Sequence, residues 1–225
     1  MSKIKHLKLH KNDFTAEETW RVFRIMAEFI DGFEEMSKLG KAVSIFGSSR
    51  IRPQDKYYKI AERTAYLLAK EGYAIITGAG PATMEAANKG ASEAKGHSIG
   101  LNIQLPTEQK PNKYIDTLLE FRYFFVRKVL FVKYAKAFVI LPGGFGTLDE
   151  FFESVTLIQT KRIKKFPIVL VGSEYWKGLI DWLNNTVLKT DRILKAELNI
   201  FKIVDKPEEV VSAIRKFYAT KPTKQ

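Results

Sequence analysis

Short apolar runs rich in β-branched and aromatic residues alternate with longer helical segments from residue 42 onward. This alternation is typical of βαβ units and predicts a parallel sheet. Nearly every position of these runs is apolar, so the strands need helices on both faces. We therefore predict an α/β fold, a three-layer α/β/α sandwich with a doubly wound, mainly parallel sheet. Its predicted strands cover 42–46, 73–77, 97–101, 137–141, 167–171 and 200–204.

Helical patterns lie before the first of these strands, between successive strands and after the last. In the first of them apolar residues recur at three- and four-residue steps, and Thr15 with Glu18 predicts a capping box at its start. The predicted helices cover 15–39, 55–71, 81–95, 122–135, 147–161, 173–189 and 206–218. Residues 102–120, which contain two prolines, are interpreted as a long loop. We predict a single domain with an N-terminal helical extension (1–40), a ligand-binding core (41–205) and a C-terminal helix and tail (206–225).

The composition excludes several kinds of chemistry. The chain has no cysteine, which removes disulfides, thiolate nucleophiles and cysteine-bound zinc. His6 and His10 have i,i+4 spacing but no carboxylate ligand placed as in a zinc motif, so we interpret them as part of a solvated tail. We expect neither a metal nor a cofactor. Catalysis must therefore use carboxylates, Arg, Lys, Ser, Thr or Tyr.

Charge and hydropathy limit the partners. No apolar stretch approaches the roughly 20 residues of a membrane span, and the N-terminus lacks an apolar signal region, so we expect a cytoplasmic protein without a membrane partner. A formal net charge of +12 favours anionic partners, either small phosphate esters or nucleic acid. The basic residues do not form one stripe with interleaved aromatics, which disfavours nucleic acid. The basic run at 161–165 is interpreted as a solvated helix end.

Three glycine-containing loops follow predicted strands and precede predicted helices. Backbone N–H groups and the helix dipole favour a phosphate at such positions, although glycine can also serve only to turn the chain. The standard P-loop pattern is absent, and the second loop has Thr83 where a dinucleotide fingerprint needs its last glycine. A mononucleotide therefore fits better than a dinucleotide. The loops are Gly47-Ser48-Ser49-Arg50, Thr77-Gly78-Ala79-Gly80-Pro81 and Pro142-Gly143-Gly144-Phe145-Gly146-Thr147.

Two charged positions stand out near the third loop. Thr147 and Glu150 form a second predicted capping box, which is the structural explanation of Glu150. The functional explanation is that Glu150, in the first turn of a helix aimed at the ligand, reaches a sugar while the loop holds phosphate. Arg127 and Lys128 lie in an apolar stretch and need an anionic partner, which is Glu150, a phosphate or water.

These residues carry a family resemblance. Residues 142–150 resemble the PGGxGTxxE motif of the Lonely Guy family of nucleoside 5′-monophosphate phosphoribohydrolases, and Arg127 with Lys128 resembles its upstream RK pair. Residues 78–86 are similar to its GGGPxxME segment, with Ala79 and Ala82 where many relatives have glycine, and residues 47–49 are similar to its first loop. The resemblance covers about residues 41 to 205.

The resemblance implies a Rossmann-like homodimer or higher oligomer that hydrolyses AMP-like nucleotides or cytokinin riboside monophosphates to free base and ribose 5-phosphate. It implies Arg127 and Glu150 as the catalytic pair. A non-catalytic nucleotide sensor on the same fold is the alternative. Nothing in the sequence supports the family's older label of lysine decarboxylase. The expected substrate-binding residues are Gly47, Ser48, Gly78, Gly80, Glu85, Lys128, Gly143, Gly144, Gly146 and Thr147.

Overall fold

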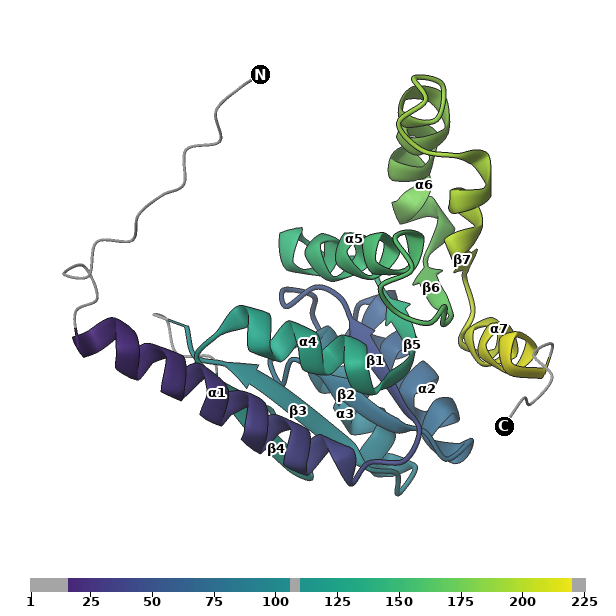
Figure 1. Ribbon diagram of the computed structural model, residues 1–225. Helices are drawn as coiled ribbons and strands as arrows, with labels where there is room; N and C mark the ends of the chain where they lie inside the picture. Colours follow the sequence, from purple (N-terminus) through teal and green to yellow (C-terminus); the bar gives the residue numbers. More distant parts are fainter. Residues whose placement is uncertain (1–15, 106–109, 220–225) are drawn as a thin grey trace, which may run out of the picture.

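The computed structural model describes residues 16–105 and 110–219 and contains one seven-stranded sheet. All neighbouring strands pair in parallel, in the order β4-β3-β2-β1-β5-β6-β7. This confirms the predicted fold class, a doubly wound parallel sheet between helices (Figure 1). The strands are β1 (Ala42–Phe46), β2 (Ala74–Thr77), β3 (Ser98–Ile103), β4 (Thr117–Phe121), β5 (Ala135–Ile140), β6 (Ile168–Val171) and β7 (Phe201–Val204).

Helices cover both faces of this sheet because the inner strands are apolar on both sides. One buried cluster joins one face to α1, α4, α5 and α6, and the other joins the opposite face to α2, α3 and α7. Successive residues of β1 alternate between the clusters, with Phe46 in the first and Ile45 in the second. The helices are α1 (Ala16–Ser37), α2 (Lys56–Lys70), α3 (Thr83–Glu93), α4 (Phe124–Tyr134), α5 (Phe145–Gln159), α6 (Ser173–Trp182), which continues into a π-helical turn (Leu183–Val187), a 3₁₀ helix (Lys195–Ile200) and α7 (Pro207–Ala219).

The order of the strands reverses between β1 and β5. From β1 the chain builds outward through β2, β3 and β4, and it then returns to place β5, β6 and β7 on the other side. In open parallel sheets a crevice forms at such a switch point, beyond the carboxyl ends of the two central strands. The loops that follow β1 and β5 therefore border the crevice where a ligand is expected to bind.

The predicted loop over 102–120 is wrong in part. Strand β3 continues to Ile103, and residues 117–121 form the edge strand β4, which pairs with β3 along its length. Exposed residues alternate in β4 with half-buried ones and with the buried Phe121, so the strand lacks the continuous burial of the inner strands. Pro106 and Pro111, shortly before it in the sequence, also favour the prediction of a loop.

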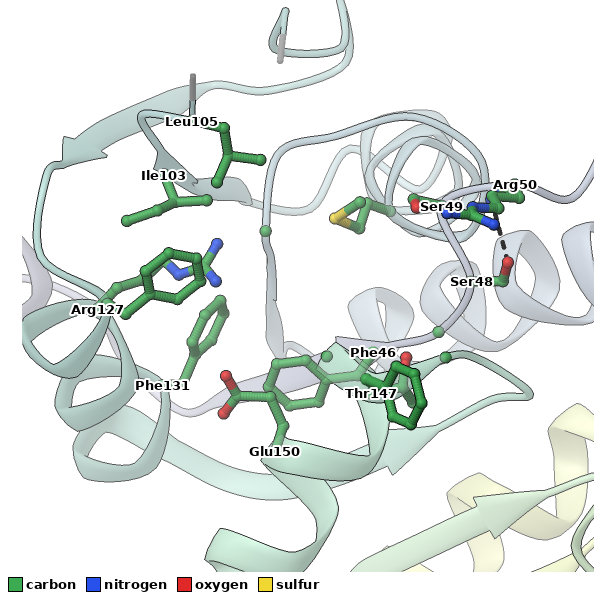
Figure 2. Close-up of a pocket in the computed structure, with 17 residues that line it drawn as sticks. Phe46, Ser48, Ser49, Arg50, Ile103, Leu105, Arg127, Phe131, Thr147 and Glu150 are labelled. Atoms are coloured by element: carbon green, nitrogen blue, oxygen red, sulfur yellow. Dashed lines mark hydrogen bonds between the residues drawn. The ribbon is translucent and has the colours of Figure 1, made fainter. Parts of the chain in front are cut away.

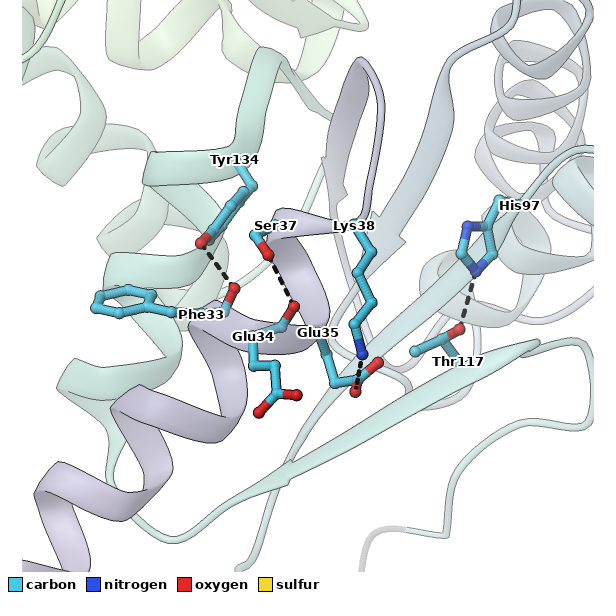
Figure 3. A network of polar contacts seen from close by, with 8 residues as sticks. All are labelled: Phe33, Glu34, Glu35, Ser37, Lys38, His97, Thr117 and Tyr134. Atoms are coloured by element: carbon cyan, nitrogen blue, oxygen red, sulfur yellow. Dashed lines mark hydrogen bonds and ion pairs between the residues drawn. The ribbon is translucent and has the colours of Figure 1, made fainter.

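Helix α1 is attached to the body of the protein near its C-terminal end. The Tyr134 hydroxyl of α4 donates a hydrogen bond to the Phe33 carbonyl at 3.2 Å, and the Phe33 and Tyr134 rings are in contact (Figure 3).

At the amino end of β3, His97 Nε2 lies 2.9 Å from Thr117 Oγ1 (Figure 3). The predicted capping box at Thr15 and Glu18, like His6 and His10, lies outside the residues whose side chains the structure describes.

Candidate active site

A cavity of about 600 Å³ opens at the switch point of the sheet. Its walls come from the loops after β1, β2, β3 and β5 and from helices α3, α4 and α5. Eight of the predicted site residues line it, and Figure 2 labels four of them: Ser48, Arg127, Thr147 and Glu150. The eight are Gly47, Ser48, Gly78, Arg127, Gly144, Gly146, Thr147 and Glu150.

The loops after β1 and β5 are hydrogen-bonded to each other. The backbone N–H of Ser48 donates to the carbonyl of Pro142 at 2.9 Å, and the N–H of Thr83 donates to the carbonyl of Ser48 at 3.2 Å. A Cβ on Gly143 would lie only 2.1 Å from Thr147 Oγ1, so the close approach of these loops requires glycine there. Gly143 thus supports the cavity from behind and does not line it.

Helix α5 begins at the cavity with its first N–H groups uncapped by any side chain. Its N-cap is Gly144, and Thr147 is the third helical residue, whose N–H donates to the Gly144 carbonyl at 3.0 Å. The predicted capping box of Thr147 and Glu150 is therefore wrong, because the helix begins two residues earlier than the sequence pattern indicated. A Cβ built on Gly144 or Gly146 meets nothing within 4 Å, so this end of the helix is open to a ligand.

Glu150 is buried in the cavity floor and is 5% exposed. Its Oε2 atom has no hydrogen-bond partner among the described residues. Burial raises the pKa of Glu150 to about 7; Lys128 and Arg127 lower it, while Glu153 and Asp149 raise it. A carboxyl group with this pKa exchanges its proton near neutral pH, as a catalytic acid or base requires.

Arg127 extends from α4 into the same cavity (Figure 2). Its guanidinium carbon lies 5.2 Å from the centre of the Phe124 ring and 5.6 Å from that of Phe131. Burial lowers the pKa of Arg127, and Glu150 and Asp149 raise it. Its Nε atom is buried without a hydrogen-bond partner among the described residues. Arg127 and Glu150 are thus close enough to influence each other, and each retains an unused polar atom.

Lys128 lies outside the cavity lining, in contrast to the substrate-binding position expected from the sequence. Its ammonium group forms ion pairs with Asp149 at 2.8 Å and with Glu153 at 3.3 Å, and its side chain is 16% exposed. Adjacent residues of a helix point about 100° apart, so Arg127 and Lys128 cannot both face the cavity. Lys128 instead reaches from α4 to two carboxylates of α5, and its positive charge lowers the pKa of Glu150.

Two more predicted residues, Gly80 and Glu85, are also absent from the cavity lining. The Asn112 side chain donates hydrogen bonds to the carbonyls of Ala79 at 3.0 Å and Gly80 at 3.1 Å, which fixes this loop against the segment before β4. Ala79 and Ala82 have φ values of 66° and 61°, a conformation that favours glycine. The loop therefore keeps the glycine-type backbone although alanine occupies both positions.

Sequence reasoning missed nine residues of the lining. One is Arg50, whose signal was its place at the end of the first glycine loop, and another is Ser49 beside it. The rest are apolar and carried no signal, because a pocket wall and a core residue have the same hydropathy. They are Phe46, Met84, Ile103, Leu105, Phe124, Phe131 and Phe145.

Comparisons with known proteins agree with this fold and show the family. The family described as possible lysine decarboxylase matches residues 84–214, more than half of the chain. The chain therefore belongs to this family, the Lonely Guy family. It is similar to the cytokinin riboside 5′-monophosphate phosphoribohydrolase of Mycobacterium tuberculosis, with 27% identity over 158 residues, 69% of this chain and 83% of the relative. The pyrimidine/purine nucleotide 5′-monophosphate nucleosidase of Escherichia coli K12 is 28% identical over 146 residues, 58% of this chain and 32% of the relative.

Solved structures share the fold at low sequence identity. The molybdenum cofactor binding protein of Rippkaea orientalis has a TM-score of 0.59 and 21% identity, over 80% of this chain and 99% of that one. The molybdenum cofactor carrier protein of Chlamydomonas reinhardtii has a TM-score of 0.58 and 18% identity, again over 80% and 99%. At these identities the likeness concerns the fold alone.

Two further observations bear on the class of protein. A pyridoxal-dependent decarboxylase needs a lysine for its Schiff base, and no lysine lines this cavity among the residues that the structure describes. Within residues 16–105 and 110–219, none of the helices has the length and apolar character needed to cross a membrane.

Proposed function

We propose that this protein hydrolyses the N-glycosidic bond of nucleoside 5′-monophosphates, releasing the free base and ribose 5-phosphate. The observation that carries the proposal is the buried carboxyl group of Glu150, which has an unpartnered oxygen and lies in a cavity beside the open end of α5. The distant relatives that act on nucleotides supply independent support.

The substrate phosphate binds at the start of α5. There the uncapped N–H groups and the helix dipole favour an anion, and Gly144 and Gly146 leave room for it. Thr147, which lines the cavity in the first turn of α5, adds a hydroxyl group. Holding the phosphate fixes the ribose over Glu150, one turn further along the helix, so binding energy from a remote group positions the reacting carbon.

Glu150 acts on the anomeric carbon. N-glycosidic cleavage passes through a positively charged, oxocarbenium-like state that a nearby carboxylate stabilises. In its ionised form Glu150 supplies that negative charge and accepts a proton from the attacking water. The water oxygen forms the new bond to C1′, the bond from C1′ to the base breaks, and the proton ends on the departing ring nitrogen.

Arg127 orients Glu150 and binds the polar edge of the substrate. Both roles follow from its unused Nε and from its attraction to Glu150 across the cavity. Its contacts with the Phe124 and Phe131 rings restrict the guanidinium group to one region, which reduces the entropy lost on binding. AMP and cytokinin riboside 5′-monophosphates are the proposed substrates.

A chromatographic assay of the purified chain tests this function. AMP and other nucleoside 5′-monophosphates, incubated without added metal, are expected to give free base and ribose 5-phosphate in equal amounts, and Glu150→Gln is expected to release neither. The alternative, a non-catalytic nucleotide sensor, predicts thermal stabilisation by nucleotides and no product. Release of phosphate in place of base would contradict the proposed bond cleavage.

We also propose that the chain forms a homodimer through the outer face of α1. Trp20, Phe23, Met26 and Ile30 recur at helical spacing, and each is at least 51% exposed. A second copy running antiparallel about Met26 would cover this stripe. It would also place Arg21 and Arg24 of one helix beside the acidic C-terminal half of its partner, which contains Asp31, Glu34 and Glu35.

Sedimentation velocity tests this arrangement. Phe23→Glu with Ile30→Glu is expected to give a monomer, whereas Ser37→Glu, an equal type of change at an exposed position of the same helix, is expected to leave the dimer intact. A dimer that survives the double substitution, or a monomeric unmodified chain, would contradict it.

A further inference from the structure

The cavity has a cation on each of two opposite sides. Figure 2 shows Arg127 on one side, near Ile103 and Leu105, and Arg50 on the other side, near Ser48 and Ser49. Glu150 lies on the floor between these two sides. Arg127 and Glu150 serve the proposed catalysis, in which Arg50 has no role.

Arg50 is held in place by its backbone and has a free head group. Its N–H donates to Ser48 Oγ at 3.1 Å, and the N–H of Ser48 donates to Pro142 at the root of the third glycine loop. The residue is exposed, and its guanidinium group makes no hydrogen bond or ion pair with the rest of the chain that the structure describes. The hydrogen-bonded backbone of this loop thus holds a guanidinium group without a partner at the side of the cavity where α5 begins.

We propose that Arg50 is a specificity-determining residue that recognises the 5′-phosphate of the substrate. This inference rests on the proposed function, and it assigns one side of the cavity to the phosphate and the opposite side to the base. A guanidinium group binds phosphate through two parallel hydrogen bonds, and a phosphate at the open end of α5 is flanked by the loop that carries Arg50.

The opposite side suits a base. Ile103, Leu105 and Phe124 line it, and apart from Arg127 it presents no polar side chain to a base among the described lining residues. An apolar wall discriminates weakly between similar groups, whereas a site that hydrogen-bonds or pairs a polar group strongly rejects molecules without it. The enzyme is therefore expected to distinguish a nucleotide from a nucleoside more sharply than one base from another.

Steady-state kinetics of Arg50→Ala test the role of Arg50, with Arg52→Ala as the matched control. Arg52 carries the same charge two residues further along the loop, is exposed and does not line the cavity. We expect Arg50→Ala to raise KM for AMP and the inhibition constant of ribose 5-phosphate about ten- to hundred-fold, while kcat stays within about threefold. Arg50→Lys restores part of the loss, because lysine binds phosphate as a point charge.

Two further readouts separate this role from a structural one. The inhibition constant of free adenine and the slow turnover of adenosine are expected to be equal in the unmodified chain, Arg50→Ala and Arg52→Ala. Equal KM values for AMP in the two alanine variants would overturn the inference, as would an equal loss with adenosine. If the unmodified chain cleaves no nucleotide, the proposed function fails, and calorimetric binding of ribose 5-phosphate to it and to Arg50→Ala still decides whether Arg50 binds phosphate.

Discussion

Helices α2 and α5 follow neighbouring parallel strands, yet they begin in opposite ways. Asp55 caps α2, and its Oδ1 accepts a hydrogen bond from the Tyr57 N–H at 2.7 Å. Helix α5 has Gly144 at the same position and no side-chain cap. A cap satisfies N–H groups that would otherwise remain unpaired, so its omission costs stability. The comparison indicates that α2 serves the fold, whereas α5 keeps its N–H groups for a ligand.

The two helices also differ in what they bury. The first turns of α5 place the carboxyl group of Glu150 in a cavity with an unpartnered oxygen. The residues that α2 buries include no carboxyl group, although the Thr64 hydroxyl also has no hydrogen-bond partner among the described residues. A buried carboxyl group without full hydrogen bonding destabilises the folded state when it ionises. Stability is therefore lowered at the beginning of α5, where the proposed chemistry needs open N–H groups and a reactive carboxylate.

Among changes at the beginnings of the two helices, placing a negative charge at the open end of α5 has the largest expected effect. Gly146→Asp puts a carboxylate where the phosphate binds, and like charges about 4 Å apart repel by about 4 kcal/mol at an effective dielectric constant of about 20. We expect kcat/KM for AMP to fall by at least about 100-fold, with no loss of thermal stability because an acidic residue favours the start of a helix. Gly178→Asp, at another open helical glycine, is the control. Equal activities of the two variants would show that phosphate does not bind at α5.

The pH dependence of turnover is the next test. If the ionised form of Glu150 is required, its pKa of about 7 predicts that kcat/KM for AMP is constant above pH 8 and falls as the pH drops through 7. The loss reaches about 100-fold at pH 5. The substrate phosphate titrates near pH 6 and adds to the fall, so the upper inflection near pH 7 is the diagnostic feature. A profile that is flat from pH 5 to 8 would exclude this role of Glu150.

Removing the cap of α2 has the smallest expected effect. Asp55→Ala deletes the hydrogen bond to the Tyr57 N–H and is expected to lower the free energy of unfolding by about 1 kcal/mol, with kcat/KM unchanged. Asp55→Asn, which can still cap, is expected to restore most of the stability. Chemical denaturation of the three proteins, measured beside their turnover, gives both numbers. A large loss of activity in Asp55→Ala would remove the distinction between the two helices.

Much of this fold could be predicted from the sequence, because its inner strands are buried on both faces. Strand β1 is apolar except for Ser44, and β6 is apolar throughout. Helical segments separate such strands, so the pattern predicts both the type and the order of these elements. Strand β4 could not be predicted in this way, since an edge strand has an exposed face and its pairing with β3 is a long-range property. The sequence pattern predicts the start of α5 two residues late. Phe145, in the first turn, is 92% exposed and does not belong to the apolar face that the helical pattern follows.

The sequence predicts those parts of the site that depend on residue type, and not those that depend on the direction in which a side chain points. Glycine loops after parallel strands pointed to the switch point, and Gly47, Gly144 and Gly146 line the cavity there. The sequence could not say that Lys128 faces the acidic side of α5 while its neighbour Arg127 faces the cavity, because rotation of α4 is set by packing. The burial that raises the pKa of Glu150 is likewise a property of the folded chain.

Glu150→Gln, measured for turnover and for stability, tests the central claim most directly. The pKa of Glu150 rises from 4.5 to about 7 on folding, so the folded state binds its proton more tightly than the unfolded state does. Its contribution to stability is full below pH 4.5 and is lost as the pH rises to 7. At pH 8 the glutamine variant is therefore expected to be more stable than the unmodified chain, by up to about 3 kcal/mol, and nearly equal to it at pH 4.

The same variant is expected to release no base from AMP at pH 8. Loss of turnover together with a gain in stability is the result that a buried catalytic carboxylate predicts. A variant that turns over AMP at the unmodified rate, or that loses both turnover and stability at pH 8, would contradict the account.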